Sequence, residues 1–213
     1  MKYIFERPLE EGVIIKRNSQ FTIDVELNGE VVRCHCPTTG RIGDLELKGV
    51  ACLISESNDP KRKLKYTVEA VSCDELEKTE KKWIGINQIL SNKLVEYFIL
   101  NNLLEDMTGK NQEIKREVKL GASKLDFLVG NTYIEVKTPL TTLNVEYGKH
   151  IKTKALSPFS STERFTKHIK ELANSLDKNE RAILLTVQQY ETSKKKERQK
   201  STNYEEVKST VEY

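Results

Sequence analysis

The sequence has no long apolar run, few cysteines and little net charge, and each of these absences excludes a class of protein. No stretch is apolar over the roughly 20 residues that a transmembrane helix needs, and the opening MKYIFERPLEEG lacks the apolar core of a signal peptide. We therefore expect a cytoplasmic protein with no membrane partner. The formal net charge of +3 excludes an overall polycation, so any nucleic-acid surface must come from local clusters of Lys and Arg.

The chain has only four cysteines, which fits a reducing compartment better than a framework of disulfides. Cys34 and Cys36 flank His35, a pattern that raises the alternative of a zinc site. Structural zinc sites use a second pair of ligands, and neither Cys52 nor Cys73 has a cysteine close by in the sequence. On a strand, the first two thiols would point to one face, as small buried hydrophobic residues do. We therefore expect core cysteines rather than metal ligands.

Short strands and turns dominate residues 13–71. The stretch QFTIDVELNGEVVRCHC alternates polar and apolar residues and breaks at Asn28-Gly29, a dipeptide typical of a tight hairpin. GVACLISES and LKYTVEAVSC predict further strands, with the basic loop NDPKRK between them. About five short strands without a helical period favour a small barrel, for which an OB-fold is one candidate.

The pattern changes near Trp83, which predicts a first domain over residues 1–82 and a second over residues 83–213. SNKLVEYFILNNLLED has helical spacing, with Ser91 or Asn92 as its cap, and EIKREVKLG alternates as a strand does. RAILLTVQQ reads as a strand covered on both faces. SSTERFTKHIKELANSL predicts an amphipathic helix whose core positions are Phe165, Ile169, Leu172 and Leu176. A strand–helix–strand order over residues 132–188 indicates a parallel βαβ unit, so the fold class is α/β (α+β), a barrel followed by a mixed sheet.

The stretch KLDFLVGNTYIEVKTPL, residues 124–140, raises the question of function. Gly130-Asn131 predicts a two-residue turn, which places Asp126 directly opposite Glu135 on the neighbouring strand. Alternation gives one apolar face and one face that carries both carboxylates. Lys137 follows two residues after Glu135 and therefore shares its face.

Like charges that face each other across two strands destabilise the pair. A Mg²⁺ ion held by Asp126 and Glu135 together with waters would remove this repulsion. The alternative is a solvated polar face on an ordinary hairpin, in which Lys124 and Lys137 neutralise the two acids.

Two further groups of residues are candidates for contact with DNA. Basic side chains cluster in the loop before LKYTVEAVSC and in the TTGR loop, and they are Lys61, Arg62, Lys63 and Arg41. Together with Tyr66 they suit phosphate contacts and base stacking, although a charged turn on a barrel rim explains them as well. Arg164 and His168 lie one helical turn apart beside the apolar stripe, where they either reach a phosphate or simply border the core.

These patterns resemble the sugar fermentation stimulation protein A family over nearly the whole chain. The resemblance implies an N-terminal OB-fold domain and a C-terminal domain of the PD-(D/E)xK nuclease type. It also implies DNA binding and regulation of sugar-fermentation genes. Members usually continue past the last predicted helix into a further strand, whereas this chain ends at Tyr213. The matching stretches are RNSQFTIDVELNG, HCPTTGRIGDL, NDPKRKLKYTVEAV, WIGINQILSNKLVE, REVKLGASKLDFLV, YIEVK, TERFTKHIKEL and AILLTVQ.

The resemblance maps the nuclease signature onto Asp126 and onto Glu135 and Lys137 as the E-x-K, with Leu125 in place of the proline. It adds Glu96 on the preceding helix, a residue that would otherwise read as solvated, as a further metal ligand. In this interpretation Asp126, Glu135 and Glu96 hold Mg²⁺ or Mn²⁺. Lys137 orients the attacking water or stabilises charge on the phosphate.

Two functions follow from this. The first is a metal-dependent endonuclease or exonuclease whose OB-fold binds DNA, and the second is a non-catalytic DNA-binding regulator of sugar-fermentation genes. The presence of all three signature residues favours the first. A carbohydrate sensor has little support, because the single tryptophan, Trp83, lies outside the predicted barrel. The sequence does not choose between single- and double-stranded DNA or RNA, and it leaves the oligomeric state open, a homodimer included.

Overall fold

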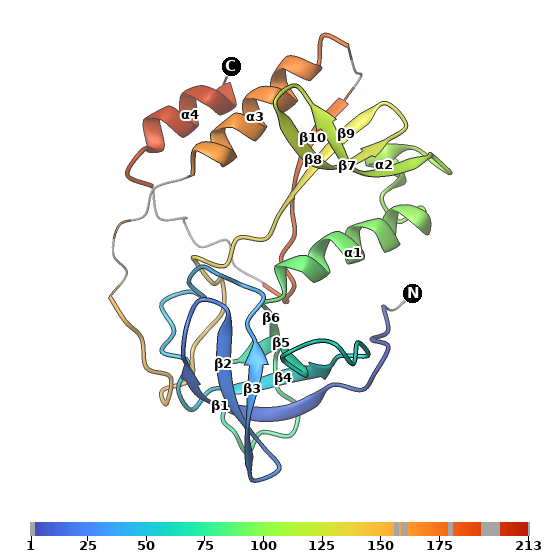
Figure 1. Cartoon of the computed structure of the whole chain (residues 1–213). Coiled ribbons are helices and arrows are strands. Elements are labelled where there is room, and N and C mark those ends of the chain that lie inside the picture. Colours follow the sequence, from blue (N-terminus) through green and yellow to red (C-terminus); the bar gives the residue numbers. More distant parts are fainter. Residues whose placement is uncertain (1–2, 156–157, 159–161, 179–180, 193–200, 213) are drawn as a thin grey trace. The chain divides into compact units, whose positions relative to one another are not determined.

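A computed structural model of the chain describes residues 3–155, 158, 162–178, 181–192 and 201–212. These residues form two compact units, and each unit is built around its own sheet (Figure 1). Within the described part of the chain, no helix is both long enough and apolar enough to cross a membrane.

The first unit is a closed barrel. Its sheet has the order β3-β2-β1-β4-β5-β6, and a parallel pairing between β3 and β5 closes it. This arrangement confirms the predicted OB-type barrel. Its strands are β1 (Glu10–Arg17), β2 (Thr22–Leu27), β3 (Glu30–His35), β4 (Ala51–Glu56), β5 (Tyr66–Ser72) and β6 (Ile84–Gly85).

The four cysteines are free and buried, as expected for core residues. Burial raises the pKa of the Cys34 and Cys52 thiols to about 12, so both stay protonated at neutral pH. Protonated thiols pack as small apolar side chains, and a thiol must lose its proton to bind zinc.

The second unit is a four-stranded mixed sheet with the order β10-β9-β8-β7, in which β10 runs parallel to β9. α1 packs its apolar side on one face of the sheet, and α3 covers the other (Figure 1). The predicted strand–helix–strand unit is therefore present. The elements are α1 (Gln88–Leu100), α2 (Glu105–Thr108), β7 (Ile114–Leu120), β8 (Ser123–Val129), β9 (Thr132–Lys137), α3 (Glu163–Ser175), β10 (Arg181–Thr186) and α4 (Tyr204–Glu212).

The helix ends differ from the sequence-based expectations at two points. α1 begins at Gln88 and not after Ser91 or Asn92, because the Asn87 side chain accepts the backbone N–H groups of the first turn. α3 ends at Ser175, so the predicted core position Leu176 lies past the helix and is 54% exposed.

The two units are interleaved along the chain, which differs from the predicted division between residues 82 and 83. The first unit contains Met1–Leu90 together with Thr138–Leu156 and Gln188–Arg198. Leu140 and Leu143, from the second of these segments, are buried in the barrel core. The apolar residues of a segment beyond β9 therefore complete the barrel.

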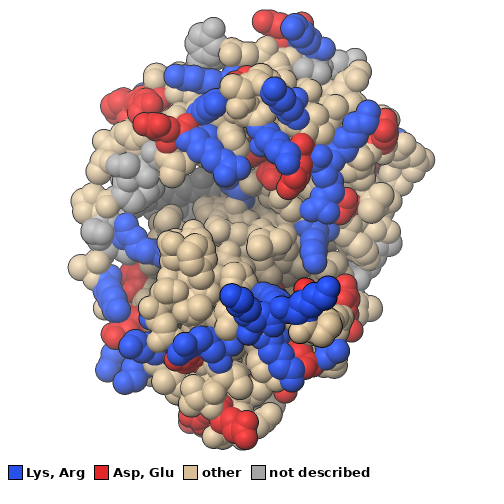
Figure 2. Space-filling model, viewed as in Figure 1, with Lys and Arg blue, Asp and Glu red and all other residues tan. Residues whose placement is uncertain are grey.

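Figure 2 shows Lys and Arg side chains interspersed with Asp and Glu over the visible face. This distribution agrees with the small net charge of +3. It also means that any nucleic-acid contact depends on a few local groups of cations.

The close approach of β1 and β2 at Gly12 gives a test of the barrel. A Cβ atom at Gly12 would lie 2.6 Å from Cγ1 of Val25 and 2.7 Å from the carbonyl oxygen of Glu26, whereas one at Gly40 would meet nothing within 4 Å. We expect Gly12→Ala to lower the free energy of unfolding by about 1–3 kcal/mol, since the strands must move apart. Gly40→Ala should change it by less than about 0.5 kcal/mol. Urea denaturation followed by circular dichroism measures both, and equal effects would contradict the packing at Gly12.

Candidate active site

The hairpin of β8 and β9 has the predicted two-residue turn at Gly130-Asn131, and Gly130 takes a positive φ of 55° there. The alternation of faces is also as predicted, with Leu125, Phe127 and Ile134 fully or almost fully buried. The ladder between the strands stops before the two acidic residues. Its paired residues are Val129 with Thr132, Leu128 with Tyr133, and Phe127 with Ile134.

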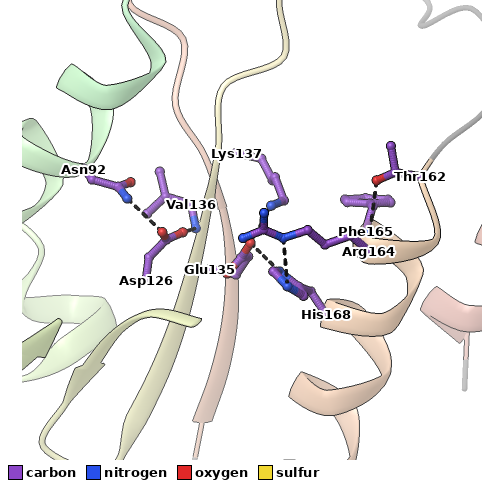
Figure 3. A network of polar contacts seen from close by, with 9 residues as sticks. All are labelled: Asn92, Asp126, Glu135, Val136, Lys137, Thr162, Arg164, Phe165 and His168. Carbon is purple, nitrogen blue, oxygen red and sulfur yellow. Dashed lines mark hydrogen bonds and ion pairs between the residues drawn. The ribbon is translucent and has the colours of Figure 1, made fainter. Parts of the chain in front are cut away.

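The carboxylate of Asp126 opens the hairpin at this point. One of its oxygens accepts the backbone N–H of Val136 at 2.7 Å, and the other accepts the side-chain amide of Asn92 at 2.7 Å (Figure 3). A side chain therefore takes the hydrogen bond of a β9 amide at the position where the two strands separate. Asn92 belongs to α1, so the same carboxylate ties the helix to the sheet.

Simple strand pairing predicts that the side chains of Asp126 and Glu135 face each other, but in the structure they point in different directions. Figure 3 shows Asp126 turned toward Asn92 and Glu135 turned toward His168. Burial raises the pKa of Asp126 above the usual range for an aspartate. The nearby charge of Glu135 raises it further, while the hydrogen bonds of Asp126 and the charge of Lys137 oppose this rise.

Glu135 is the most buried carboxylate of the hairpin, with its side chain 3% exposed. Its Oε1 contacts Nδ1 of His168 at 2.6 Å and also contacts the ammonium of Lys137. Its Oε2 is buried and has no hydrogen-bond partner among the described residues. A buried carboxylate oxygen left without a partner is rare in proteins and costs about 1–3 kcal/mol, so it marks a place where a ligand would be stabilised.

A chain of side chains on α3 fixes the orientation of Glu135. Nε of Arg164 is 3.4 Å from Nε2 of His168. Arginine can only donate, so Nε2 accepts, and a neutral His168 donates its Nδ1–H to Glu135. Arg164 is exposed, whereas His168 is 3% exposed. The sequence left open whether His168 borders the core or reaches a phosphate. In the structure the ring is buried, and both of its nitrogens are engaged inside the protein, by Glu135 and Arg164.

Glu96, which the family resemblance proposes as a further metal ligand, lies on α1 and forms an ion pair with Arg116 of β7 at 3.4 Å. Within the described part of the chain, no three His, Cys, Asp or Glu side chains come together as a metal-binding group. Asp126 and Glu135 are the two acidic residues of the nuclease signature, and the charge of Glu135 raises the pKa of Asp126. The donors that fit a cation are therefore the free oxygen of Glu135 and the carboxylate of Asp126.

The predicted DNA-binding cations of the first unit lie in its loops. Lys61, Arg62 and Lys63 are exposed between β4 and β5, and no side chain of the described residues forms an ion pair with them. Lys65 instead pairs with Glu56 at 2.7 Å and lies over the Tyr66 ring, 5.2 Å from its centroid. The structure therefore leaves three neighbouring cations of this loop without an acidic partner among the described residues.

Arg41 and His35 are two further basic residues of the first unit. Arg41 is half-buried in the loop after β3. Arg62 lies close enough to His35 on β3 that its charge, together with burial as the larger cause, lowers the pKa of that histidine. A neutral His35 at physiological pH adds no charge to the loop cluster.

Residues 15–86 match the SfsA N-terminal OB domain, and residues 89–211 match the Sugar fermentation stimulation protein RE domain. The chain belongs to the sugar fermentation stimulation protein family. Its similarity to a Sugar fermentation stimulation protein homolog of Prochlorococcus marinus (strain MIT 9301) is 38% identity over 194 residues, 84% of this chain and 75% of the relative. A homolog of Acaryochloris marina (strain MBIC 11017) is 41% identical over 177 residues, 79% of this chain and 68% of the relative.

The fold of this family member also resembles a solved structure, that of Pyrococcus furiosus SfsA in complex with Ca²⁺. The TM-score is 0.75 at 24% identity, and the match covers 100% of this chain and 87% of the other. The likeness confirms the combination of an N-terminal barrel and a mixed-sheet unit with helices.

The sequence did not indicate Asn92 as a partner of Asp126 or the backbone of Val136 as its second donor. Both contacts form only because the hairpin opens, which no local pattern encodes. The role of Asn87 as the N-terminal cap of α1 could have been predicted, since this asparagine directly precedes the residues with helical spacing in WIGINQIL.

The role of His168 can be tested through stability. We expect His168→Ala to lower the free energy of unfolding by about 1–3 kcal/mol, because the buried Oε1 of Glu135 loses one of its two partners. Lys167→Ala, at an exposed position on the same helix, should change it by less than about 0.5 kcal/mol. Thermal and urea unfolding measure both variants. A His168→Ala protein as stable as the parent would show that the ring does not hold Glu135.

Proposed function

We propose that this protein is a metal-dependent nuclease whose site lies around Asp126, Glu135 and Lys137 and cleaves phosphodiester bonds of DNA. The observation that carries the proposal is the buried Oε2 of Glu135, which has no partner among the described residues and lies close enough to the half-buried carboxylate of Asp126 for the two charges to repel each other. A cation would satisfy this oxygen. It would also offset the repulsion that contributes to the raised pKa of Asp126.

The donor set suits a hard cation such as Mg²⁺ or Mn²⁺, which binds carboxylate oxygens and keeps several waters. Asp126 and Glu135 would hold it, and Glu96 would join them only by giving up its ion pair with Arg116. When bound, such a cation supplies a Lewis acid and an activated water. The relative from Pyrococcus furiosus is described in complex with Ca²⁺, which also takes oxygen ligands, and this supports a cation here.

The other residues of the site have distinct roles in this proposal. The Lys137 ammonium lies at the Glu135 carboxylate and is 35% exposed, so it can reach both the buried acid and an approaching phosphate. There it would stabilise negative charge that develops in the transition state. Arg164 is exposed one turn before His168 and would bind a flanking phosphate. His168 would keep the Glu135 carboxylate in one orientation.

DNA binding would use the loop cations of the barrel in addition. Lys61, Arg62 and Lys63 follow one another on an exposed loop, where their charges can neutralise phosphates of DNA. Arg41 would add a contact from the neighbouring loop of the same unit.

A non-catalytic DNA-binding regulator is the second candidate, and a specific observation favours it. Both oxygens of Asp126 already accept hydrogen bonds, and Glu96 already pairs with Arg116. A site whose acids are satisfied by the protein itself can persist for stability alone. Catalysis and binding therefore need to be measured separately.

Cleavage is tested with the isosteric variant Glu135→Gln. We expect the parent protein to cleave labelled DNA with Mg²⁺ or Mn²⁺ but not with EDTA. Glu135→Gln should lose at least about 100-fold in rate, because the charge that holds the cation is removed. Mg²⁺ should also raise the Tm of the parent protein and not that of the variant. Glu205→Gln, at an exposed position of α4, serves as the control and should behave as the parent.

The cleavage assay is run on single- and double-stranded DNA and RNA. A shift of the nucleic acid without any product, in every metal condition, would replace the nuclease by the regulator. A Mg²⁺-dependent rise in Tm that survives in Glu135→Gln would place the cation elsewhere.

The loop cations are tested through the salt dependence of DNA binding. For the double variant Arg62→Ala/Lys63→Ala, we expect a shallower dependence of DNA binding on salt. The slope of the logarithm of the association constant against the logarithm of the salt concentration should decrease in magnitude by about 1.5–2, since two phosphate contacts are lost. Lys48→Ala, also exposed in the first unit, should leave the slope unchanged. Fluorescence anisotropy with a labelled oligonucleotide gives the slope. An unchanged slope in the double variant would remove this loop from the DNA-binding surface.

A further inference from the structure

The first unit carries a cavity of about 660 Å³ that contains none of the residues discussed as catalytic or DNA-binding. Its size is in the range of sites that bind small molecules. Aromatic, amide and charged side chains line it together, which is the combination that binds polar ring systems. The lining includes Trp83, Tyr190, Asn144, Glu146, Lys78 and Lys82.

Trp83 is the residue of the cavity that most suggests a bound ligand. It is the single tryptophan of the chain and is half-buried. Its indole N–H donates to no acceptor in the described part of the chain, and its ring stacks on no other described aromatic side chain. The indole N–H of a buried tryptophan usually finds an acceptor, and this half-buried ring at the cavity has neither an acceptor nor an aromatic partner among the described residues.

The protein fixes the position of Trp83 through Asp74. The Asp74 carboxylate accepts a hydrogen bond from the Lys78 ammonium at 2.8 Å and another from the backbone N–H of Lys82 at 2.6 Å. Burial opposes the ionisation of Asp74, but these two donors outweigh it and keep the pKa of Asp74 below its usual range. Ile84, the residue after Trp83, pairs with Val71 of β5. The backbone of Trp83 is thus held between two anchored neighbours, which limits the positions that its ring can take.

The cations around the cavity differ in what they offer. Lys78 pairs with Asp74, and Lys81 pairs with Glu11 at 2.7 Å with its side chain only 4% exposed. The Lys82 side chain is exposed and forms no ion pair within the described residues. One ammonium group is therefore available at the cavity, which suits a single phosphate rather than a polyphosphate.

A second segment of the chain also lines the cavity. The backbone N–H of Asn144 donates to the hydroxyl of Tyr190 at 3.3 Å, and the hydroxyl of Thr192 donates to the Asn144 carbonyl at 2.9 Å. These bonds hold the segment in place. Asn144 and Glu146 are among the residues that line the cavity there.

We propose that this cavity binds a nucleobase that carries a phosphate, with the base stacked on Trp83 and the phosphate at Lys82. A free nucleotide presents this chemistry, and so does an unpaired base within a single strand. Stacking on an aromatic ring accepts any base, while the phosphate contact makes the affinity dependent on salt. The proposal needs neither a cation nor Glu135, so it stands apart from the proposed nuclease activity.

The single tryptophan makes the test direct, because all indole emission comes from this cavity. We expect AMP, dTMP or an oligothymidylate to quench the emission of Trp83 saturably in EDTA, and ribose 5-phosphate, which lacks a base, to leave it unchanged. Quenching by the mononucleotides identifies a nucleotide site, and quenching by the oligothymidylate alone identifies a strand site. If none of these probes quenches the emission, or if ribose 5-phosphate quenches it as strongly as AMP does, the proposal is overturned.

Variants test the same site without the fluorescence of Trp83. Anisotropy of a labelled oligothymidylate should show about tenfold weaker binding for Trp83→Ala and a smaller loss for Trp83→Phe, which keeps an aromatic ring. Lys82→Ala should weaken binding and reduce its salt dependence, and Lys48→Ala is the exposed control. Circular dichroism verifies that each variant is folded. Parental affinity in folded Trp83→Ala and Lys82→Ala variants would overturn the proposal.

The two proposals can fail separately. A protein that cleaves DNA with Mg²⁺ while the emission of Trp83 stays constant would retain the nuclease and lose the base-binding cavity. A protein whose emission is quenched in EDTA but that never cleaves would do the reverse.

Discussion

The buried carboxylate of Glu135 is the constraint on which the second unit depends. A charge at 3% exposure is tolerated only if its surroundings stabilise it, and here Lys137 on the same strand and His168 on α3 do so. These contacts link α3 to the sheet through a buried charge rather than through apolar packing. Among the described residues they nevertheless leave Oε2 of the carboxylate without a hydrogen-bond partner, so they stabilise the buried charge only in part.

Asp126 links the same hairpin to the other helix, α1. By taking the N–H of Val136 it ends the β-ladder early, and by accepting the amide of Asn92 it joins the sheet to α1. Two acidic residues of one hairpin are thus held by helices on different faces of the sheet. The hairpin positions the acids and the helices orient them, at the point where the ladder between the two strands ends.

Much of this could be predicted from the sequence because it rests on local chemistry. Gly130-Asn131 determined the turn, alternation determined the buried face, and the residues of the barrel strands predicted a barrel. The opening at Asp126 could not be predicted, since it results from a side chain competing with the backbone for one N–H. The burial of His168 was missed for a similar reason: a histidine beside an apolar stripe looks the same in the sequence whether it faces solvent or a buried acid.

The interleaving of the two units has a consequence for how the protein can be divided. Leu140 and Leu143 fill the core of the barrel, although they follow β9 in the chain. A fragment that stops after β5 would contain every long strand of the barrel and still expose the apolar surface that these two leucines cover. Such fragments should aggregate, and a barrel that folds alone would need the 138–156 segment joined to it by a designed linker.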